Sequence, residues 1–128
     1  MKFFTVHKDY KRVSEEATQI IEKCKFKIER YGSVSEIDLQ DIYYILQKIK
    51  PLIDNCINAN LPADAAALFI QASLFSSILE SGQLITEDSI ETTLKVITER
   101  ILMAKSKKEK IAWDFTMKQY RRILQDSI

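Results

Sequence analysis

Apolar residues recur every three or four positions along most of the chain, and charged residues fill the positions between them. This spacing is typical of amphipathic helices, in which the apolar side chains form one stripe. The first stripe extends from Val13 to Tyr31 and stops before Gly32, where we expect the first helix to end. Residues 1–8 precede this stripe, and we expect them to form a loose N-terminal arm.

A second stripe follows Ser35 and contains Pro51. Ser35 and Asp38 form a shortened version of the capping box that begins many helices. Proline removes one backbone hydrogen bond and disfavours helix at the preceding residue, yet the stripe keeps its phase across Pro51. We therefore predict one kinked helix rather than two short ones. Its apolar members are Ile42, Ile45, Ile49, Leu52, Ile53 and Cys56.

The third segment differs from the others because it carries no charge between Asp64 and Glu80. Pro62 suits the first turn of a helix, and Gly82 suits the position after its end. Apolar side chains occupy opposing faces, so neighbouring helices should cover this segment nearly all round. It is shorter than the roughly 18 to 20 apolar residues of a membrane span. We predict a central core helix.

Two further helices are expected after Gly82. Thr86 is placed as an N-cap, and the acidic residues that follow it suit the positive end of a helix dipole. Ser106 and Glu109 form another capping box, and the apolar phase shifts beyond it. We therefore predict a break near Lys105–Lys108 and a fifth helix after it, with the fourth helix packed on the third.

The composition agrees with an all-α fold. The 128 residues include only two glycines and two prolines, fewer than the turns of an antiparallel sheet require. At 46%, the apolar content is too high for a disordered chain. The prediction is one domain over residues 1–128, a bundle of four to five helices with the third helix central and buried.

Cellular context is indicated by the N-terminus and the two cysteines. His7 and Lys8 end the first apolar run well short of a signal-peptide core, so we expect a cytoplasmic protein that does not associate with membranes. Cys24 and Cys56 are far apart and occupy apolar helical positions. We expect them to be reduced and buried, with a disulfide or redox role as the alternative.

The chain lacks the residues that most catalytic sites require. The only histidine is His7, which we expect to be exposed, so zinc and di-iron sites built on histidine are excluded. Gly32 and Gly82 alone cannot form a phosphate-binding loop. The acidic clusters fall in first helical turns, where they stabilise the helix dipole. We therefore expect no enzyme activity, cofactor, metal ion or small-molecule substrate.

Charge is sorted along the chain, although the formal net charge is only +1. Residues 1–34 carry +3, residues 35–104 carry −6 and residues 105–128 carry +4. If the first and last helices lie side by side, they form one basic face that attracts an acidic protein or a nucleic acid. In the alternative, the basic helices pack against the acidic ones and the charges serve solubility.

Apolar side chains on otherwise charged helix faces are candidate contacts for a partner. On the last helix, Trp113 and Tyr120 belong to one apolar face, whereas Ile111 and Phe115 lie on the other beside basic residues. Exposed aromatic and arginine side chains are typical anchors of protein interfaces. The predicted contact residues are Phe26, Ile111, Phe115 and Arg122. In the alternative, the N-terminal arm folds over them.

Two functions follow from these features, since helical bundles of this size serve many unrelated purposes. The first is a non-enzymatic protein-interaction module, such as an adaptor, a small complex subunit or an inhibitor or immunity type protein, which also self-associates. The second is a nucleic-acid-binding protein that uses both terminal helices, with Trp113 or Tyr120 stacking on a base. Its predicted contacts on the last helix are Lys107, Lys108, Lys110, Lys118, Arg121 and Arg122.

Overall fold

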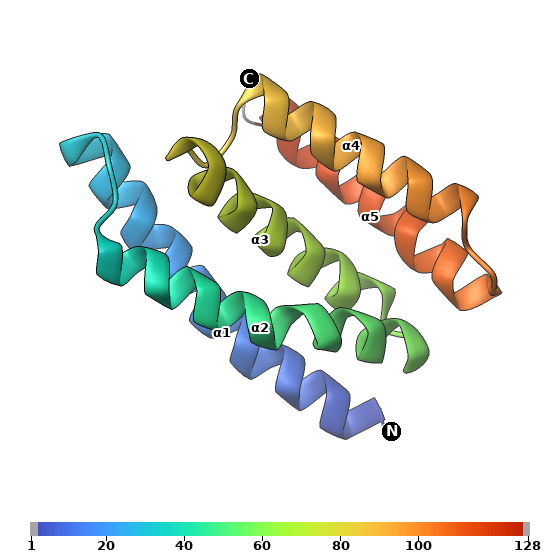
Figure 1. Cartoon of the computed structure of the whole chain (residues 1–128). Helices are drawn as coiled ribbons and strands as arrows, with labels where there is room; N and C mark the ends of the chain where they lie inside the picture. The colour runs from blue at the N-terminus through green and yellow to red at the C-terminus, as the bar shows by residue number, and fades with distance from the viewer. Residues whose placement is uncertain (1–2, 127–128) are drawn as a thin grey trace.

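The computed structural model describes residues 3–126, and within them it contains helices and no strand. Figure 1 shows the helices and their order along the chain. The predicted all-α bundle is confirmed, and it has five helices. They are α1 (Phe3–Tyr31), α2 (Glu36–Asn58), α3 (Pro62–Ser81), α4 (Glu87–Leu102) and α5 (Lys107–Asp126).

Helix α2 begins and continues as its sequence predicts. The Ser35 hydroxyl accepts a hydrogen bond from the Asp38 N–H, and the Asp38 carboxylate accepts one from the Ser35 N–H at 2.9 Å. These reciprocal bonds satisfy two backbone donors that a helix start leaves free. The helix then runs through Pro51 without ending, so one helix forms rather than two.

The later helix boundaries also follow local signals. Pro62 is the first residue of α3, and Gly82 ends it with a left-handed φ of 75°, which glycine adopts without strain. Thr86 caps α4 through a reciprocal pair of hydrogen bonds with Ser89. The Ser106 hydroxyl accepts the Glu109 N–H at the start of α5. The predicted break between α4 and α5 is therefore confirmed.

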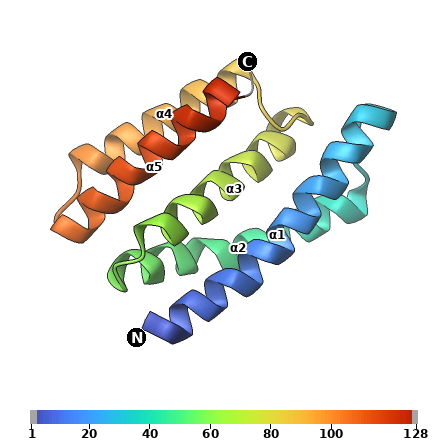
Figure 2. The ribbon, with the colours of Figure 1, turned by 180° about the vertical axis from the view of Figure 1, so that it is seen from behind.

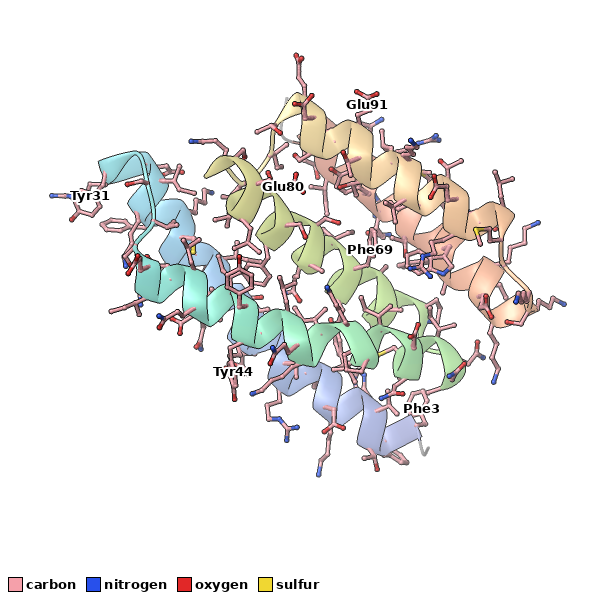
Figure 3. The ribbon with its side chains drawn as sticks, in the orientation of Figure 1. Phe3, Tyr31, Tyr44, Phe69, Glu80 and Glu91 are labelled. Carbon is pink, nitrogen blue, oxygen red and sulfur yellow. The ribbon has the colours of Figure 1, made fainter. Side chains whose placement is uncertain are left out.

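The N-terminal segment differs from the expected loose arm, because α1 is already helical at Phe3. Figure 3 labels Phe3 at the start of this helix and Tyr31 at its end. Val6 is completely buried, and His7 Nδ1 lies 2.7 Å from a carboxylate oxygen of Asp64 in the first turn of α3. His7 is consequently only partly exposed, contrary to our expectation. These tertiary contacts stabilise first turns that have no capping signal in the sequence.

Helix α3 lies in the middle of the molecule, with α1 and α2 on one side and the α4–α5 pair on the other (Figures 1 and 2). By length and composition it is the one helix among the described residues that could cross a membrane. It packs instead against α1, α2 and α5. The main hydrophobic core lies between these helices, and its largest fully buried side chains include Phe75, Ile42, Ile45, Ile49 and Leu68.

Both cysteines are free and buried in this core, as predicted. Burial, together with the negative charges of Asp64 and Asp9, raises the pKa of Cys56 to about 12. Such a thiol is protonated at neutral pH and is therefore unreactive. Cys24 and Cys56 thus act as small apolar residues.

Helix α4 packs on α5 and makes very little contact with α3. The expectation that the fourth helix packs on the third is wrong, because α5 occupies that place. A second, smaller core joins α4, α5 and one side of α3, and its buried members are Ile70, Ile97 and Tyr120. The apolar side chains of α4 pack mainly against α5, and α4 therefore has little apolar surface left to cover α3.

Candidate functional site

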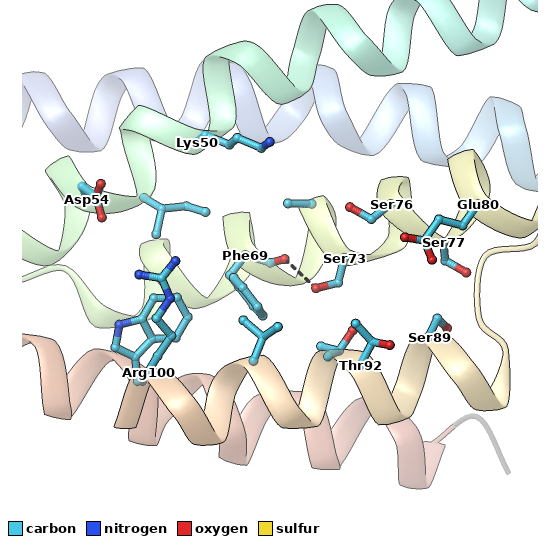
Figure 4. Close-up of a pocket in the computed structure, with 15 residues that line it drawn as sticks. Lys50, Asp54, Phe69, Ser73, Ser76, Ser77, Glu80, Ser89, Thr92 and Arg100 are labelled. Atoms are coloured by element: carbon cyan, nitrogen blue, oxygen red, sulfur yellow. Dashed lines mark hydrogen bonds between the residues drawn. The ribbon is translucent and has the colours of Figure 1, made fainter. Parts of the chain in front are cut away.

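A groove runs between α2 and α4, and α3 forms its floor (Figure 4). It exists because α2 and α4 make no contact with each other, although each contacts α3. The cavity measures about 470 Å³. Its floor extends from Phe69 to Glu80, a helical rise of about 16 Å or three turns.

Small side chains keep the floor of the groove low. Ala72, Ser73 and Ser76 face into it, and Ser76 is exposed. The Ser73 hydroxyl donates to the Phe69 carbonyl at 3.1 Å, and the Ser77 hydroxyl donates to the Gln83 carbonyl at 2.7 Å. Because these hydroxyls already donate to backbone carbonyls, a ligand that covers the floor need not accept hydrogen bonds from them.

Aromatic side chains close one end of the groove. The rings of Phe69 and Trp113 stand perpendicular with centroids 5.0 Å apart. The Arg100 guanidinium lies 5.6 Å from the centre of the Trp113 ring, a cation–π geometry. A second recess of about 830 Å³ shares Arg100 and Trp113 and continues past Ile57 and Met103 toward the α4–α5 turn.

Charged side chains border the groove, and three of them have no ion-pair partner among the described residues. Lys50 and Asp54 come from α2, and Glu80 comes from α3. Within residues 3–126 none of these three forms an ion pair or a hydrogen bond through its side chain. They are available to ligands that enter the groove.

Two buried acids elsewhere have structural roles. Asp38 pairs with Lys27 at 2.8 Å and with Lys23 at 3.7 Å, which fixes α1 to the start of α2. Burial alone would raise the pKa of Asp38, but hydrogen bonds from Lys27 and Ser35 outweigh it and lower the pKa to about 2. Asp64 similarly fixes α1 to α3 through His7.

No metal-binding cluster was found among the residues that the structure describes. No three side chains of histidine, cysteine, aspartate or glutamate come close enough together there to hold an ion. The groove itself contains serine, threonine, lysine and carboxylate side chains but no histidine or cysteine.

The predicted contact residues do not form one patch. Phe26 is exposed on α1, where the Arg30 guanidinium lies 5.9 Å from its ring. Ile111 and Arg122 are exposed on α5, whereas Phe115 is partly buried. Helices α1 and α5 make no contact and lie on opposite sides of α3, which separates Phe26 from the α5 residues. For the same reason the two basic terminal helices do not form one face.

The residues predicted for nucleic-acid binding are accessible, but the proposed stacking residues are not. Trp113 and Tyr120 are buried against α3 and α4, so neither ring is free to stack on a base. The six basic side chains of α5 are all exposed: Lys107, Lys108, Lys110, Lys118, Arg121 and Arg122.

The groove residues were missed by sequence reasoning, although a signal for them exists. Small residues on one side of a helix, such as Ala72, Ser73 and Ser76 of α3, let a neighbouring helix approach closely. Ala72, Ser73 and Ser76 line the groove that remains because α4 packs on α5 and makes little contact with α3. The small residues indicate a surface that a helix can approach, but they do not indicate that this surface is uncovered.

The chain was compared with protein-family models, with curated proteins and with solved structures, and none of them matches.

Proposed function

We propose that this chain is a non-enzymatic protein-interaction module that binds a helical segment of a partner protein in the groove between α2 and α4. The observation that carries the proposal is the uncovered face of α3 between two helices that do not contact each other. Helices in bundles pack with axes about 8–10 Å apart. A partner helix in this groove would contact α2, α3 and α4 at once.

The dimensions and lining of the groove suit such a segment. A floor about three turns long matches the usual length of an amphipathic recognition helix, which binds through residues spaced three and four apart. The small residues Ser73 and Ser76 allow a helix to approach closely, and Phe69 and Trp113 provide an apolar end for a large side chain. A central apolar contact with a polar rim is the usual anatomy of a protein interface.

Charged side chains at the two ends of the groove would specify the orientation of the partner. Arg100 lies at the aromatic end of the groove and Glu80 at the opposite end (Figure 4). A helix with an acidic residue near Arg100 and a basic residue near Glu80 would complement both. This pattern separates the proposed partner from a generic apolar helix.

Photo-crosslinking in the native cell tests the proposal with a matched pair of positions. Thr92 and Thr98 are both exposed on α4, but only Thr92 lines the groove. With benzoylphenylalanine at residue 92 we expect a covalent adduct whose crosslinked peptide is helical and amphipathic, and with the same group at residue 98 we expect none. Equal adducts at both positions, or none at either, would overturn the proposal.

Groove filling gives a second test. Ser76→Trp places a large ring on the floor, whereas Ser33→Trp places one at the exposed α1–α2 turn. We expect Ser76→Trp to abolish the residue-92 adduct while circular dichroism shows unchanged helix content, and Ser33→Trp to preserve the adduct. Persistence of the adduct in Ser76→Trp would contradict occupation of the groove. An adduct at twice the chain mass would identify the partner as a second copy.

The nucleic-acid alternative has less support. The basic side chains of α5 are accessible, but Trp113 and Tyr120 are buried and α1 does not extend the basic surface of α5. Binding to generic DNA or RNA would fall steeply as salt rises, because phosphate contacts release counterions. A titration at low salt with no binding would remove this alternative.

A further inference from the structure

Four large apolar side chains protrude at one end of the bundle. Phe4 is 81% exposed, Leu102 79%, Met103 71% and Phe3 53%. Phe3 stacks on His7 with ring centroids 6.2 Å apart, and the rings of Phe3 and Phe4 form a T-shaped pair. His7 is itself fixed to Asp64, so the two rings are held in place at the surface rather than folded onto the core.

These side chains come from distant segments that meet at the same end of the molecule. The His7–Asp64 pair places the start of α1 beside the start of α3. Lys108 Nζ donates to the Asn58 carbonyl at 3.0 Å, which places the start of α5 beside the end of α2. The N-terminus, the α2–α3 turn and the α4–α5 turn therefore form one end of the bundle (Figures 1 and 2).

Exposed lysines follow the protruding side chains in the same segments of the chain. Lys8, Lys105, Lys107 and Lys110 are exposed, and none forms an ion pair within the part of the chain that the structure describes. Of the acids near these segments, Glu109 accepts the Lys105 N–H and Asp9 pairs with Arg12, whereas Asp54 and Glu99, which line the adjoining recess, form no ion pair within the described residues. We call this surface the basic end and define it by Phe3, Phe4, Leu102, Met103, Lys8, Lys105, Lys107 and Lys110.

In contrast to the expectation from the sequence that the protein does not associate with membranes, we propose that the basic end binds the surface of an anionic lipid bilayer. Exposed apolar side chains enter the boundary between headgroups and acyl chains, and the surrounding lysines attract acidic headgroups. Stable attachment needs both signals, and here both occur on one surface. A nucleic acid would use the lysines but leave Phe4 and Leu102 in water, so the apolar residues favour a bilayer.

Attachment at the basic end leaves the rest of the molecule free. The opposite end carries the acidic start of α4, with Glu87 and Asp88 exposed, which an anionic surface repels. Leu102, Lys107 and Lys110 do not line the groove or the adjoining recess. The proposal is therefore independent of the protein partner, and substitutions at these three positions test it without altering the groove.

Vesicle co-sedimentation of the full chain is the direct test. We expect binding to phosphatidylcholine vesicles containing roughly one-third phosphatidylserine, little binding to phosphatidylcholine alone, and weaker binding as salt is raised. Absence of binding to the anionic vesicles, or equal binding to both kinds, would overturn the proposal. So would capture of an oligonucleotide under conditions in which no vesicle is bound.

Matched variants localise the binding. Lys107→Glu with Lys110→Glu should lower the apparent affinity at least about tenfold. Lys118→Glu with Arg122→Glu removes the same charge from the same helix outside the basic end and should have a much smaller effect. Leu102→Asp should also weaken binding, whereas Ile37→Asp, at another exposed apolar residue outside the basic end, should not. Equal losses within each pair would assign the binding to diffuse charge and overturn the proposal.

A spectroscopic measurement separates insertion from simple attraction. A tryptophan introduced by Leu102→Trp should be quenched by brominated lipids in anionic vesicles, whereas buried Trp113 in the unmodified chain should not. Circular dichroism of every variant checks that the fold persists. A Leu102→Trp variant that binds vesicles without quenching would contradict insertion of this end.

Discussion

The three-helix unit α1–α3 and the α4–α5 pair are built differently. The first unit has a continuous core that includes Phe75, Ile42 and Leu68. It is further held by side-chain bonds between helices, such as those of Lys27 with Asp38 and His7 with Asp64. Helix α4 is held mainly by a small cluster around Ile97. Among the described residues, no ion pair joins either α4 or α5 to the first unit.

The weaker attachment of α4 explains why the groove lies where it does. Helix α5 joins the main core through Ala112 and Trp113, but α4 depends almost entirely on α5 for its position. A helix with few buried contacts opens at lower free energy than the core around it. The groove therefore has one rigid wall, α2, and one wall, α4, that can adjust to what binds there.

The largest expected effect comes from breaking the core of the first unit. Phe75→Ala removes a completely buried ring and should lower the free energy of unfolding by about 3–5 kcal/mol. Hydrogen exchange should then show lower protection in every helix, because α1, α2, α3 and α5 contribute to this core and α4 depends on α5. Urea unfolding followed by circular dichroism gives the free energy.

Ile97→Ala is the matched change in the smaller cluster, since Ile97 is also completely buried. It should lower the protection of α4 amides while leaving those of α1 and α2 close to their original values. If protection falls equally in all five helices, the chain unfolds as one unit and the contrast between the two regions is wrong.

Helix boundaries were predictable because their signals are local. Ser35, Pro62, Gly82 and Thr86 each act on backbone groups within a few residues, so their effect does not depend on the fold. The start of α1 was not predictable in this way. Its first turns depend on burial of Val6 and other contacts with residues far along the chain.

The groove could not be predicted from the sequence for a related reason. The apolar face of α5 was recognised, but periodicity does not specify which helix it faces. Whether α4 or α5 covers α3 depends on how the turns at Gly82 and at residues 103–106 direct the chain. The same limit explains why Phe26 and Ile111 were grouped, although α1 and α5 do not meet.

Lowering the pH should weaken the first unit selectively. The pKa of Asp38 is lowered from its ordinary value of 3.8 to about 2, so its ionised form stabilises the fold. This contribution is fully present above pH 4 and disappears as the pH falls through 2, which amounts to about 2 kcal/mol. Asp38→Asn should lose about this much at neutral pH and should converge with the unmodified protein near pH 2.

Asp54→Asn is the control for the Asp38 prediction, because Asp54 forms no ion pair in the described part of the chain. Its free energy of unfolding should follow that of the unmodified protein from pH 7 to pH 2. Urea unfolding at several pH values measures all three proteins. A constant difference between Asp38→Asn and the unmodified protein at every pH would show that ionisation of Asp38 is not what stabilises the α1–α2 contact.

The smallest effect comes from comparing two alanines on α3 that lie on its covered and uncovered sides. Ala65 is 2% exposed inside the main core, whereas Ala72 faces the groove. Ala65→Leu adds volume where no space exists and should destabilise the protein by about 1–3 kcal/mol. Ala72→Leu should change the free energy of unfolding by less than about 0.5 kcal/mol, because its new methyl groups enter open space. Equal destabilisation by the two changes would mean that α4 closes over α3 in solution, and that the groove is not available to a partner.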